Sequence, residues 1–489
     1  MNRRTKIVAT LGPATDDPQA LEALIRAGCD VVRINFSHGD ADTHGRRIRM
    51  VRAAARELDT DVAVLADLAG PKIRIDRFRD GPVELEKGQA FTLFAEDPPP
   101  PGDESGVGVV YLGLPGDVEP GSELLLDDGL IAMRVVRVDD TRIHCEVQTA
   151  GRLYDRKGLN LRGGGLSLPG VSEADEADIR RAADWQVDYL AVSFPRSAAD
   201  IEQARTLLRR AGGEAHIVSK IERTEAIDNL DAVIEASDAV LVARGDLGVE
   251  IGEAELPGLQ KRIIACSLEH NRPVITATQM MQSMVESPVP TRAEVLDVAN
   301  AVIDGTDAVM LSAETAVGRH PARVIEAMAR ICEGAERHVQ ATLPQRRLNV
   351  KPERTDQAIA MAASILAANV PVRALIALTE SGSTARWLSR VRSPVPIIAL
   401  SPNRASLRRM RLYQHVQPLF FASEESEGAA AGREAVEHVL RAGLIEPGDR
   451  VILTLGDDMG LEGGTNTMKI VTAGEVGDDG EVQGEFENL

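Results

Sequence analysis

Eight short, apolar, β-rich runs, each followed by a segment with helical periodicity, constrain the fold of this chain more than any other feature. The runs lie at 6–12, 31–37, 62–68, 188–194, 216–222, 239–247, 273–279 and 308–314. Apolar strands separated by helices are typical of a parallel sheet that is buried on both faces. Eight such units predict an α/β fold of the (β/α)8, or TIM-barrel, type.

Two further segments do not belong to these eight strand–helix units. Residues 72–167 combine proline- and glycine-rich turns with alternating strands, which predicts an inserted all-β domain, a small β-barrel that acts as a lid. Residues 346–475 alternate apolar strands with helices, which predicts a C-terminal doubly wound α/β domain. The barrel is therefore assigned to 1–71 and 168–345, and the acidic stretch 476–489 is interpreted as a loose tail.

The composition excludes several classes of function. A formal net charge of −20 argues against general binding to nucleic acids or anionic membranes. The first residues contain no apolar signal segment, and no apolar run is long enough to span a membrane. The four cysteines are far apart and form no CxxC pair, so neither a zinc site nor a disulfide framework is expected, and a reducing cytoplasm fits.

Polar residues gather at the carboxyl ends of the predicted barrel strands. Because these ends meet on one face of a (β/α)8 barrel, we expect an active site there. Seven of the eight runs contribute: Asn35 and Ser37, Asp67, Ser193, Lys220 and Glu222, Arg244 and Asp246, Thr278, and Ser312 and Glu314.

The SKIE segment places Lys220 and Glu222 on the same side of one strand, since side chains alternate with a period of two. Asp246 follows the next strand. Two carboxylates beside a lysine predict an oxygen site for Mg²⁺ near an ammonium group. An ordinary ion pair at the barrel rim is the alternative. The expected convergence of Arg33, Arg74 and Thr278 on the same site disfavours it.

Seven motifs, in the order in which they occur, resemble those of pyruvate kinase. They are VRINFSHG, GPKIR, SKIE, ARGDLGVEI, ATQMM, PTRAEVLDVANAV and DGTDAVMLSAETAVG. The resemblance extends from the first strand to about residue 475. It implies a barrel, a β-domain inserted after the third strand, a C-terminal regulatory α/β domain and a homotetramer.

The same resemblance implies a reaction and a set of roles. The reaction is phosphoryl transfer from phosphoenolpyruvate to ADP, which gives pyruvate and ATP and requires Mg²⁺ or Mn²⁺. A core-facing or merely structural role is the alternative for His38. The implied roles are phosphate binding by Arg33, stabilisation of the phosphoryl group and the enolate by Lys220, metal binding by Glu222 and Asp246, substrate binding by Gly245, Asp246 and Thr278 (with a water as the proton route), and nucleotide binding by Arg74, Lys157, His38 and Asn35.

Lys72 is conspicuous because the chain contains eight lysines and 47 arginines. Relatives that require K⁺ read DTKGPE where this chain reads DLAGPK, so they carry a glutamate at the position of Lys72. Their K⁺ pocket resembles Asn35, Ser37, Asp67 and Leu68. A lysine supplies the positive charge itself, which predicts activity without K⁺. A solvated residue at the lid hinge is the alternative.

The segment LTESGST, residues 378–384, joins a strand to a helix. The hydroxyls of Thr379, Ser381, Ser383 and Thr384, together with backbone N–H groups, predict an anion nest, although a simple turn and N-cap would look similar. The resemblance implies the phosphate loop of an allosteric effector. A later loop carries Asp457, Asp458 and Glu462, which would repel a second phosphate, so AMP or a sugar monophosphate is the expected effector.

Two other classes of function remain open at this point. One is a different metal-dependent barrel enzyme that acts on pyruvate or phosphoenolpyruvate, such as an aldolase or lyase; Arg74 and Lys157 disfavour it. The other is a metabolite-binding or scaffold protein with a degenerate site, which the intact set of Lys220, Glu222 and Asp246 disfavours.

Overall fold

The structure is a computed structural model that describes residues 3–340, 352–423, 425, 428–457 and 463–474. The chain divides into two compact units: Met1–Val32, Arg47–Val64 and Met281–Leu489 form one, and Arg33–Arg46 and Leu65–Met280 form the other. The inserted β-domain and most of the polar strand ends belong to the second unit. The predicted tail, residues 476–489, lies outside the described residues.

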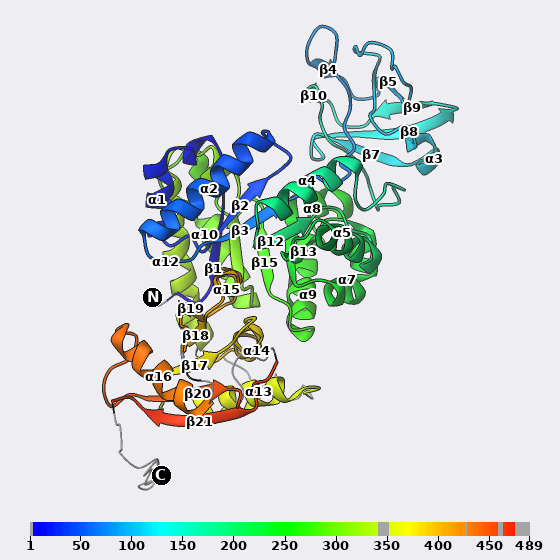
Figure 1. Cartoon of the computed structure of the whole chain (residues 1–489). Helices are drawn as coiled ribbons and strands as arrows, with labels where there is room; N and C mark the ends of the chain where they lie inside the picture. The colour runs from blue at the N-terminus through cyan, green and yellow to red at the C-terminus, as the bar shows by residue number, and fades with distance from the viewer. Residues whose placement is uncertain (1–2, 341–351, 424, 426–427, 458–462, 475–489) are drawn as a thin grey trace. The chain divides into compact units, whose positions relative to one another are not determined.

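All eight predicted barrel strands are present, and they close in the order β1-β16-β15-β14-β13-β12-β3-β2. Figure 1 labels β1, β2, β3, β12, β13 and β15 among them. Nearly every residue in them is buried, which explains why the runs are apolar throughout. The prediction of a (β/α)8 barrel is confirmed. The strands are β1 Lys6–Thr10, β2 Val31–Asn35, β3 Ala63–Asp67, β12 Tyr189–Val192, β13 His216–Ile221, β14 Ala239–Ala243, β15 Val274–Ala277 and β16 Ala308–Leu311.

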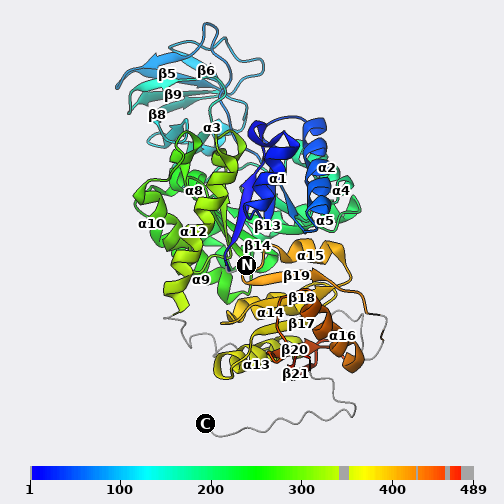
Figure 2. The same ribbon diagram turned by 90° about the vertical axis from the view of Figure 1, so that its left-hand side faces the viewer.

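Helices connect these strands and pack apolar faces inward. In the first of them, Leu21, Leu24 and Ile25 are buried at the spacing of one helical face. Helices α10 and α12 lie side by side (Figure 2). The segments are η1 Pro13–Thr15, α1 Pro18–Arg26, α2 Ala41–Glu57, α4 Glu173–Asp184, α5 Ala198–Arg210, α6 Thr224–Asp228, α7 Leu230–Ala236, α8 Arg244–Ile251, α9 Leu256–Glu269, η2 Gln282–Val285, α10 Arg292–Asp304, α11 Ala313–Ala316 and α12 Pro321–Gln340.

Each strand ends earlier than the sequence predicted, because the chain turns or becomes helical directly after the last ladder hydrogen bonds. Asp246 therefore lies in the first turn of α8 rather than in a strand, and Glu314 lies in α11. The polar side chains still lie at the ends of their strands or shortly after them, so they remain at the carboxyl end of the barrel.

The inserted segment forms two sheets, whose strand pairs are mostly antiparallel, around its own core. The sequence predicted a small β-barrel for this segment. A six-stranded sheet has the order β11-β7-β8-β9-β5-β6, and a two-stranded sheet pairs β10 with β4. Its core extends from Ile73 to Leu166. Its elements are β4 Val83–Leu85, β5 Ala90–Phe94, β6 Gly106–Gly108, α3 Leu114–Asp117, β7 Glu123–Leu126, β8 Ile131–Asp139, β9 Arg142–Val147, β10 Gly151–Leu153 and β11 Leu159–Leu161.

The C-terminal domain is built on a five-stranded sheet with the order β19-β18-β17-β20-β21. The last strand is antiparallel, whereas the others are parallel. No helix in the described part of the chain has the length and apolar character that crossing a membrane requires. The elements are α13 Thr355–Asn369, β17 Ala374–Leu378, α14 Ser383–Val391, β18 Ile397–Ser401, α15 Arg404–Met410, β19 Val416–Phe420, α16 Gly428–Arg441, β20 Arg450–Leu455 and β21 Thr467–Thr472.

Candidate active site

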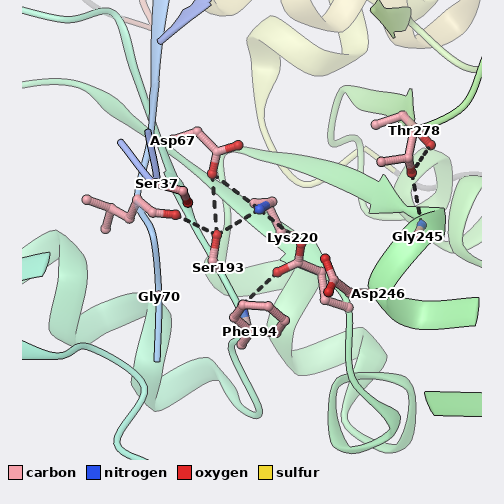
Figure 3. A network of polar contacts seen from close by, with 12 residues as sticks. Ser37, Asp67, Gly70, Ser193, Phe194, Lys220, Gly245, Asp246 and Thr278 are labelled. Carbon is pink, nitrogen blue, oxygen red and sulfur yellow. Dashed lines mark hydrogen bonds and ion pairs between the residues drawn. The ribbon is translucent and has the colours of Figure 1, made fainter. Parts of the chain in front are cut away.

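Lys220 is surrounded by oxygen atoms. Its Nζ atom lies 2.7 Å from Ser193 Oγ, 2.9 Å from Glu222 Oε1 and 3.3 Å from Asp67 Oδ1 (Figure 3). Ile221, between Lys220 and Glu222, is fully buried in the barrel wall. The period of a strand thus brings the lysine and the glutamate together, and barrel neighbours add the other two groups.

Arg33 supplies a second cation to the same group. Its Nε atom lies 2.6 Å from Asp67 Oδ2, and both side chains are buried. Burial opposes the charge on Lys220, but the carboxylates of Asp67 and Glu222 outweigh it and raise the lysine pKa. Burial would raise the pKa of Asp67, but Arg33 and Lys220 outweigh it and lower that pKa. Lys220 and Asp67 are therefore both charged at neutral pH, and the cationic side chains of Lys220 and Arg33 suit the binding of an anion.

Glu222 and Asp246 form the candidate metal site. Burial raises the pKa of the Glu222 carboxyl more than Lys220 lowers it, and the nearby charge of Asp246 raises it further. The second oxygen of Glu222, Oε2, accepts the N–H of Phe194 at 2.9 Å, which fixes the carboxylate in place. A divalent cation would relieve the repulsion between the two carboxylates, and oxygen donors are those that Mg²⁺ and Mn²⁺ prefer. The residues therefore fit the metal.

Lys72 contacts Asp246, one of the two candidate metal ligands. Its Nζ atom lies 2.9 Å from Asp246 Oδ1 and 3.7 Å from Asp128 Oδ1. Burial opposes the lysine charge, but Asp246 outweighs it and raises the lysine pKa. The expected pocket at Asn35, Ser37, Asp67 and Leu68 contributes none of the described contacts of Lys72. The ammonium therefore acts on the carboxylates of the metal site.

Thr278 and Gly245 lie together after β15 and β14. Thr278 has a φ of 69°, which is rare for a β-branched residue and indicates that the surrounding structure holds the backbone in a strained conformation. The Gly245 N–H donates to Thr278 Oγ1 at 3.0 Å (Figure 3). Arg244 supports this turn by donating to the backbone oxygens of Ala277 and Thr278. A hydroxyl and a backbone N–H thus face each other at the mouth of the barrel.

The predicted nucleotide-binding residues have no described contact with Lys220. Lys157 Nζ lies 2.7 Å from Asp127 Oδ1, and Arg74 donates to a backbone oxygen, that of Arg156. The side chain of His38 is exposed, so it is not a core histidine. The convergence of these residues on a nucleotide remains a prediction.

Some contributors were missed by reasoning from sequence. The sequence identified Ser193 only as a polar residue at a strand end. Its hydroxyl accepts a hydrogen bond from Lys220 at 2.7 Å and donates one to the backbone oxygen of Leu68 at 2.8 Å. The backbone N–H of Phe194, with a φ of 57°, was not predictable at all. The polar strand-end pattern was a sufficient signal for Ser193, whereas no residue type marks the Phe194 contact.

The predicted effector loop is the turn before helix α14. Gly382 has a φ of 85° and donates its N–H to Thr379 Oγ1 at 3.0 Å, and the Thr384 hydroxyl lies 2.7 Å from that of Thr465. Ser383 Oγ lies 3.4 Å from the buried carboxylate of Asp356. Of the acidic residues in the later loop, Asp458 and Glu462 lie outside the described residues, whereas Asp457 accepts hydrogen bonds from Asn466 and Thr467.

Comparisons with known proteins agree along almost the whole chain. Residues 2–325 match the family described as "Pyruvate kinase, barrel domain", and residues 357–471 match "Pyruvate kinase, alpha/beta domain". "Pyruvate kinase II" of Salmonella typhimurium is 50% identical over 96% of this chain and 98% of its own length. A "Pyruvate kinase" of Haemophilus influenzae is 48% identical over 93% of this chain and 96% of its own. A crystal structure of a pyruvate kinase from Cryptosporidium parvum superposes with a TM-score of 0.88 at 34% identity, over 96% of both chains.

Proposed function

Since this chain belongs to the pyruvate kinase family, and transfers the phosphoryl group of phosphoenolpyruvate to ADP to give pyruvate and ATP, we propose that the group around Lys220 performs that transfer. The observation that supports this most strongly is the position of the Lys220 ammonium within 3.3 Å of two carboxylates and a hydroxyl. Phosphoryl transfer depends mainly on positioning and on neutralising charge, which such a group provides.

Arg33 and Lys220 bind the phosphoryl group of the substrate in this proposal. The Lys220 ammonium also stabilises the enolate oxygen that is left when the phosphoryl group departs. The backbone N–H of Gly245, with Asp246 and Thr278, orients the rest of phosphoenolpyruvate. The Thr278 hydroxyl, through a water, supplies the proton that converts the enolate to pyruvate.

Glu222 and Asp246 would hold Mg²⁺ or Mn²⁺. When bound, the metal would neutralise charge on the transferring group and the substrate. Arg74 and Lys157, with His38 and Asn35 nearby, bind the nucleotide phosphates, and the inserted domain that carries Lys157 serves as the lid. The chain has no GxxxxGK[ST] motif, so fixed cations take the place of a phosphate-binding loop.

A coupled assay tests this assignment against the other barrel chemistries. We expect pyruvate to form from phosphoenolpyruvate only when both ADP and Mg²⁺ are present. Cleavage of a carbon–carbon bond in the substrate would instead identify a lyase or aldolase, and pyruvate release without ADP would identify hydrolysis of the phosphate ester.

Lys72 supports a proposal that the enzyme needs no K⁺. The Lys72 ammonium adds a fixed positive charge beside Asp246 and near Glu222. At an effective dielectric constant of about 20, a charge roughly 4 Å away contributes about 4 kcal/mol, which is sufficient to replace a weakly held ion. A tethered charge is also independent of the ion concentration.

We expect the wild-type enzyme to be fully active in a buffer that contains only bulky organic cations. Lys72→Glu should lower kcat about tenfold or more, because it reverses the charge next to the metal ligands, and should introduce some response to K⁺. Steady-state assays with and without K⁺ measure both effects. A wild-type rate that rises about tenfold on adding K⁺ would refute the substitution of Lys72 for the ion.

The loop from Thr379 to Thr384 supports allosteric activation by a phosphorylated effector. Its turn presents backbone N–H groups at the beginning of α14, where a phosphate is favoured. The acidic residues of the later loop, Asp457, Asp458 and Glu462, would repel a second phosphate, which favours a monophosphate such as AMP or a sugar monophosphate.

Changing Ser383 and Thr384 together to alanine should abolish activation by such an effector, since two hydroxyl donors to its phosphate are lost. The activation curve with AMP and with ribose 5-phosphate measures this effect. Thr472→Ala is the matched control, because it lies on β21 opposite Arg450, at the other end of the sheet. Unchanged activation in the double variant would show that the effector binds elsewhere.

The apolar surface of helix α10 supports the proposed homotetramer. Leu296 and Ile303 lie seven residues apart, hence on one face, and their exposed fractions are 64% and 52%. Val289, just before the helix, is 63% exposed. Exposed apolar residues that cluster in this way are typical of protein–protein interfaces.

Leu296→Asp should convert the tetramer into smaller species, because a buried charge at an interface is strongly unfavourable. Light scattering coupled to gel filtration measures the mass, and Val110→Asp, at a site 71% exposed in the inserted domain, is the control. A tetramer that survives Leu296→Asp would exclude α10 from the interface.

The location proposed for the enzyme is the cytoplasm. All four cysteines are free and buried, which fits a reducing compartment.

A further inference from the structure

We propose that Asp231, Cys266 and His270 form a binding site for a zinc-class metal ion at the surface of helices α7 and α9. The site is separate from Glu222 and Asp246, which offer only oxygen atoms. The three donor atoms lie within 4.8 Å of one another, in the one such group among the described histidine, cysteine and acidic residues.

Two of the ligands come from one helix. Cys266 lies in α9 and His270 caps its carboxyl end, so they are four residues apart and share one face of the helix. Asp231 lies in the first turn of α7, the helix that packs against α9. A metal ion held by these residues would join the two helices.

The donor atoms are already close to the required spacing. Asp231 Oδ1 lies 2.9 Å from His270 Nε2 and 3.2 Å from Cys266 Sγ. Zinc bond lengths combined with tetrahedral angles place such donors about 3.4–3.6 Å apart. An outward shift of about half an ångström would therefore admit the ion, and the exposed Asp231 side chain, 78% accessible, is free to make it.

The ligand types select the metal. Thiolate and imidazole donors favour Zn²⁺ and related transition metals, whereas Mg²⁺ prefers oxygen. Three protein ligands leave a fourth position for water. The neighbouring charges of Glu269 and Arg262 have opposite signs, so their effects on a cation partly offset each other.

Hydrogen bonds alone, without a metal ion, are the competing explanation for why these three side chains lie together. Burial and then the hydrogen bond to Asp231 raise the pKa of the Cys266 thiol to about 12, so the thiol stays protonated and donates a hydrogen bond to the carboxylate when no metal is bound. The sequence concealed the site because Asp231 is 35 residues before Cys266 and the pattern contains no CxxC pair.

Cobalt provides a direct test in the full-length protein with saturating Mg²⁺. We expect one equivalent of Co²⁺ to produce a sulfur-to-cobalt charge-transfer band in the near ultraviolet, and Zn²⁺ to displace it. Cys266→Ser should abolish the band. Asp231→Asn and His270→Gln should each weaken Zn²⁺ binding by about tenfold or more. Mutating a residue that merely supports a metal ligand already lowers metal affinity by at least about tenfold, and a direct ligand should matter no less.

Cys145→Ser is the matched control, because Cys145 is also a free, buried cysteine but belongs to the core of the inserted domain. It should leave the band unchanged. Absence of the band in the wild type, or its persistence in Cys266→Ser, would overturn the proposal. Because Asp231 is exposed, Asp231→Asn tests the site even if the cysteine variant fails to fold, and unchanged Zn²⁺ affinity in that variant would equally refute it.

Discussion

Replacing Lys220 by methionine is expected to lower kcat by about 10²–10³-fold, comparable to the loss of one donor from an oxyanion site. Methionine keeps much of the volume of the side chain but removes the ammonium that lies 2.7 Å from Ser193 Oγ and 2.9 Å from Glu222 Oε1. The positive charge is needed most when negative charge shifts to the enolate oxygen. The loss should therefore appear mainly in kcat rather than in KM.

The fold should survive this change, because Asp67 keeps its ion pair with Arg33 and Glu222 keeps the hydrogen bond from the Phe194 N–H. Thermal unfolding and Mg²⁺ binding provide the check on structure. Lys87→Met, at an exposed lysine in the inserted domain, controls for the loss of a lysine as such. If Lys220→Met retained more than about a tenth of the wild-type kcat, the transition-state role of Lys220 would be wrong.

The second large effect is expected for stability. Arg390, in helix α14 of the C-terminal domain, forms an ion pair with Asp307, directly before β16, and the two side chains are 1% and 0% exposed. Arg390 Nη1 lies 2.6 Å from Asp307 Oδ2, and Nη2 contacts the other carboxylate oxygen. Arg390→Met should lower the free energy of unfolding by about 3–5 kcal/mol, because it removes the bidentate partner of a buried carboxylate.

Chemical denaturation of the full chain measures this loss. The double variant Arg390→Met with Asp307→Leu should be less destabilised than the sum of the single variants, because the two side chains interact directly and their effects are coupled. Arg319→Met is the control: its pair with Glu286 is about two-thirds exposed on both sides, and its loss should cost about 1 kcal/mol or less. Equal effects of Arg390→Met and Arg319→Met would contradict this explanation.

The barrel and the core of its active site were predictable because their signals are local. Burial on both faces makes each strand apolar, and the helices between them carry their own periodicity, so the eight units could be identified without any long-range information. The pairing of Lys220 with Glu222 follows from the two-residue period of a single strand.

The remaining contacts were decided by tertiary structure, because they join segments that no local pattern relates. Lys72 was expected near Asp67, five residues away, but its ammonium lies against Asp246, 174 residues along the chain. The left-handed backbone of Thr278 and the N–H of Phe194 that fixes Glu222 depend on neighbouring strands, not on residue type. The sequence alone determined which side chains stand at the ends of the strands. The direction in which each one points, and the partner it finds, depended on closure of the barrel, since only closure sets the distances between groups on different strands.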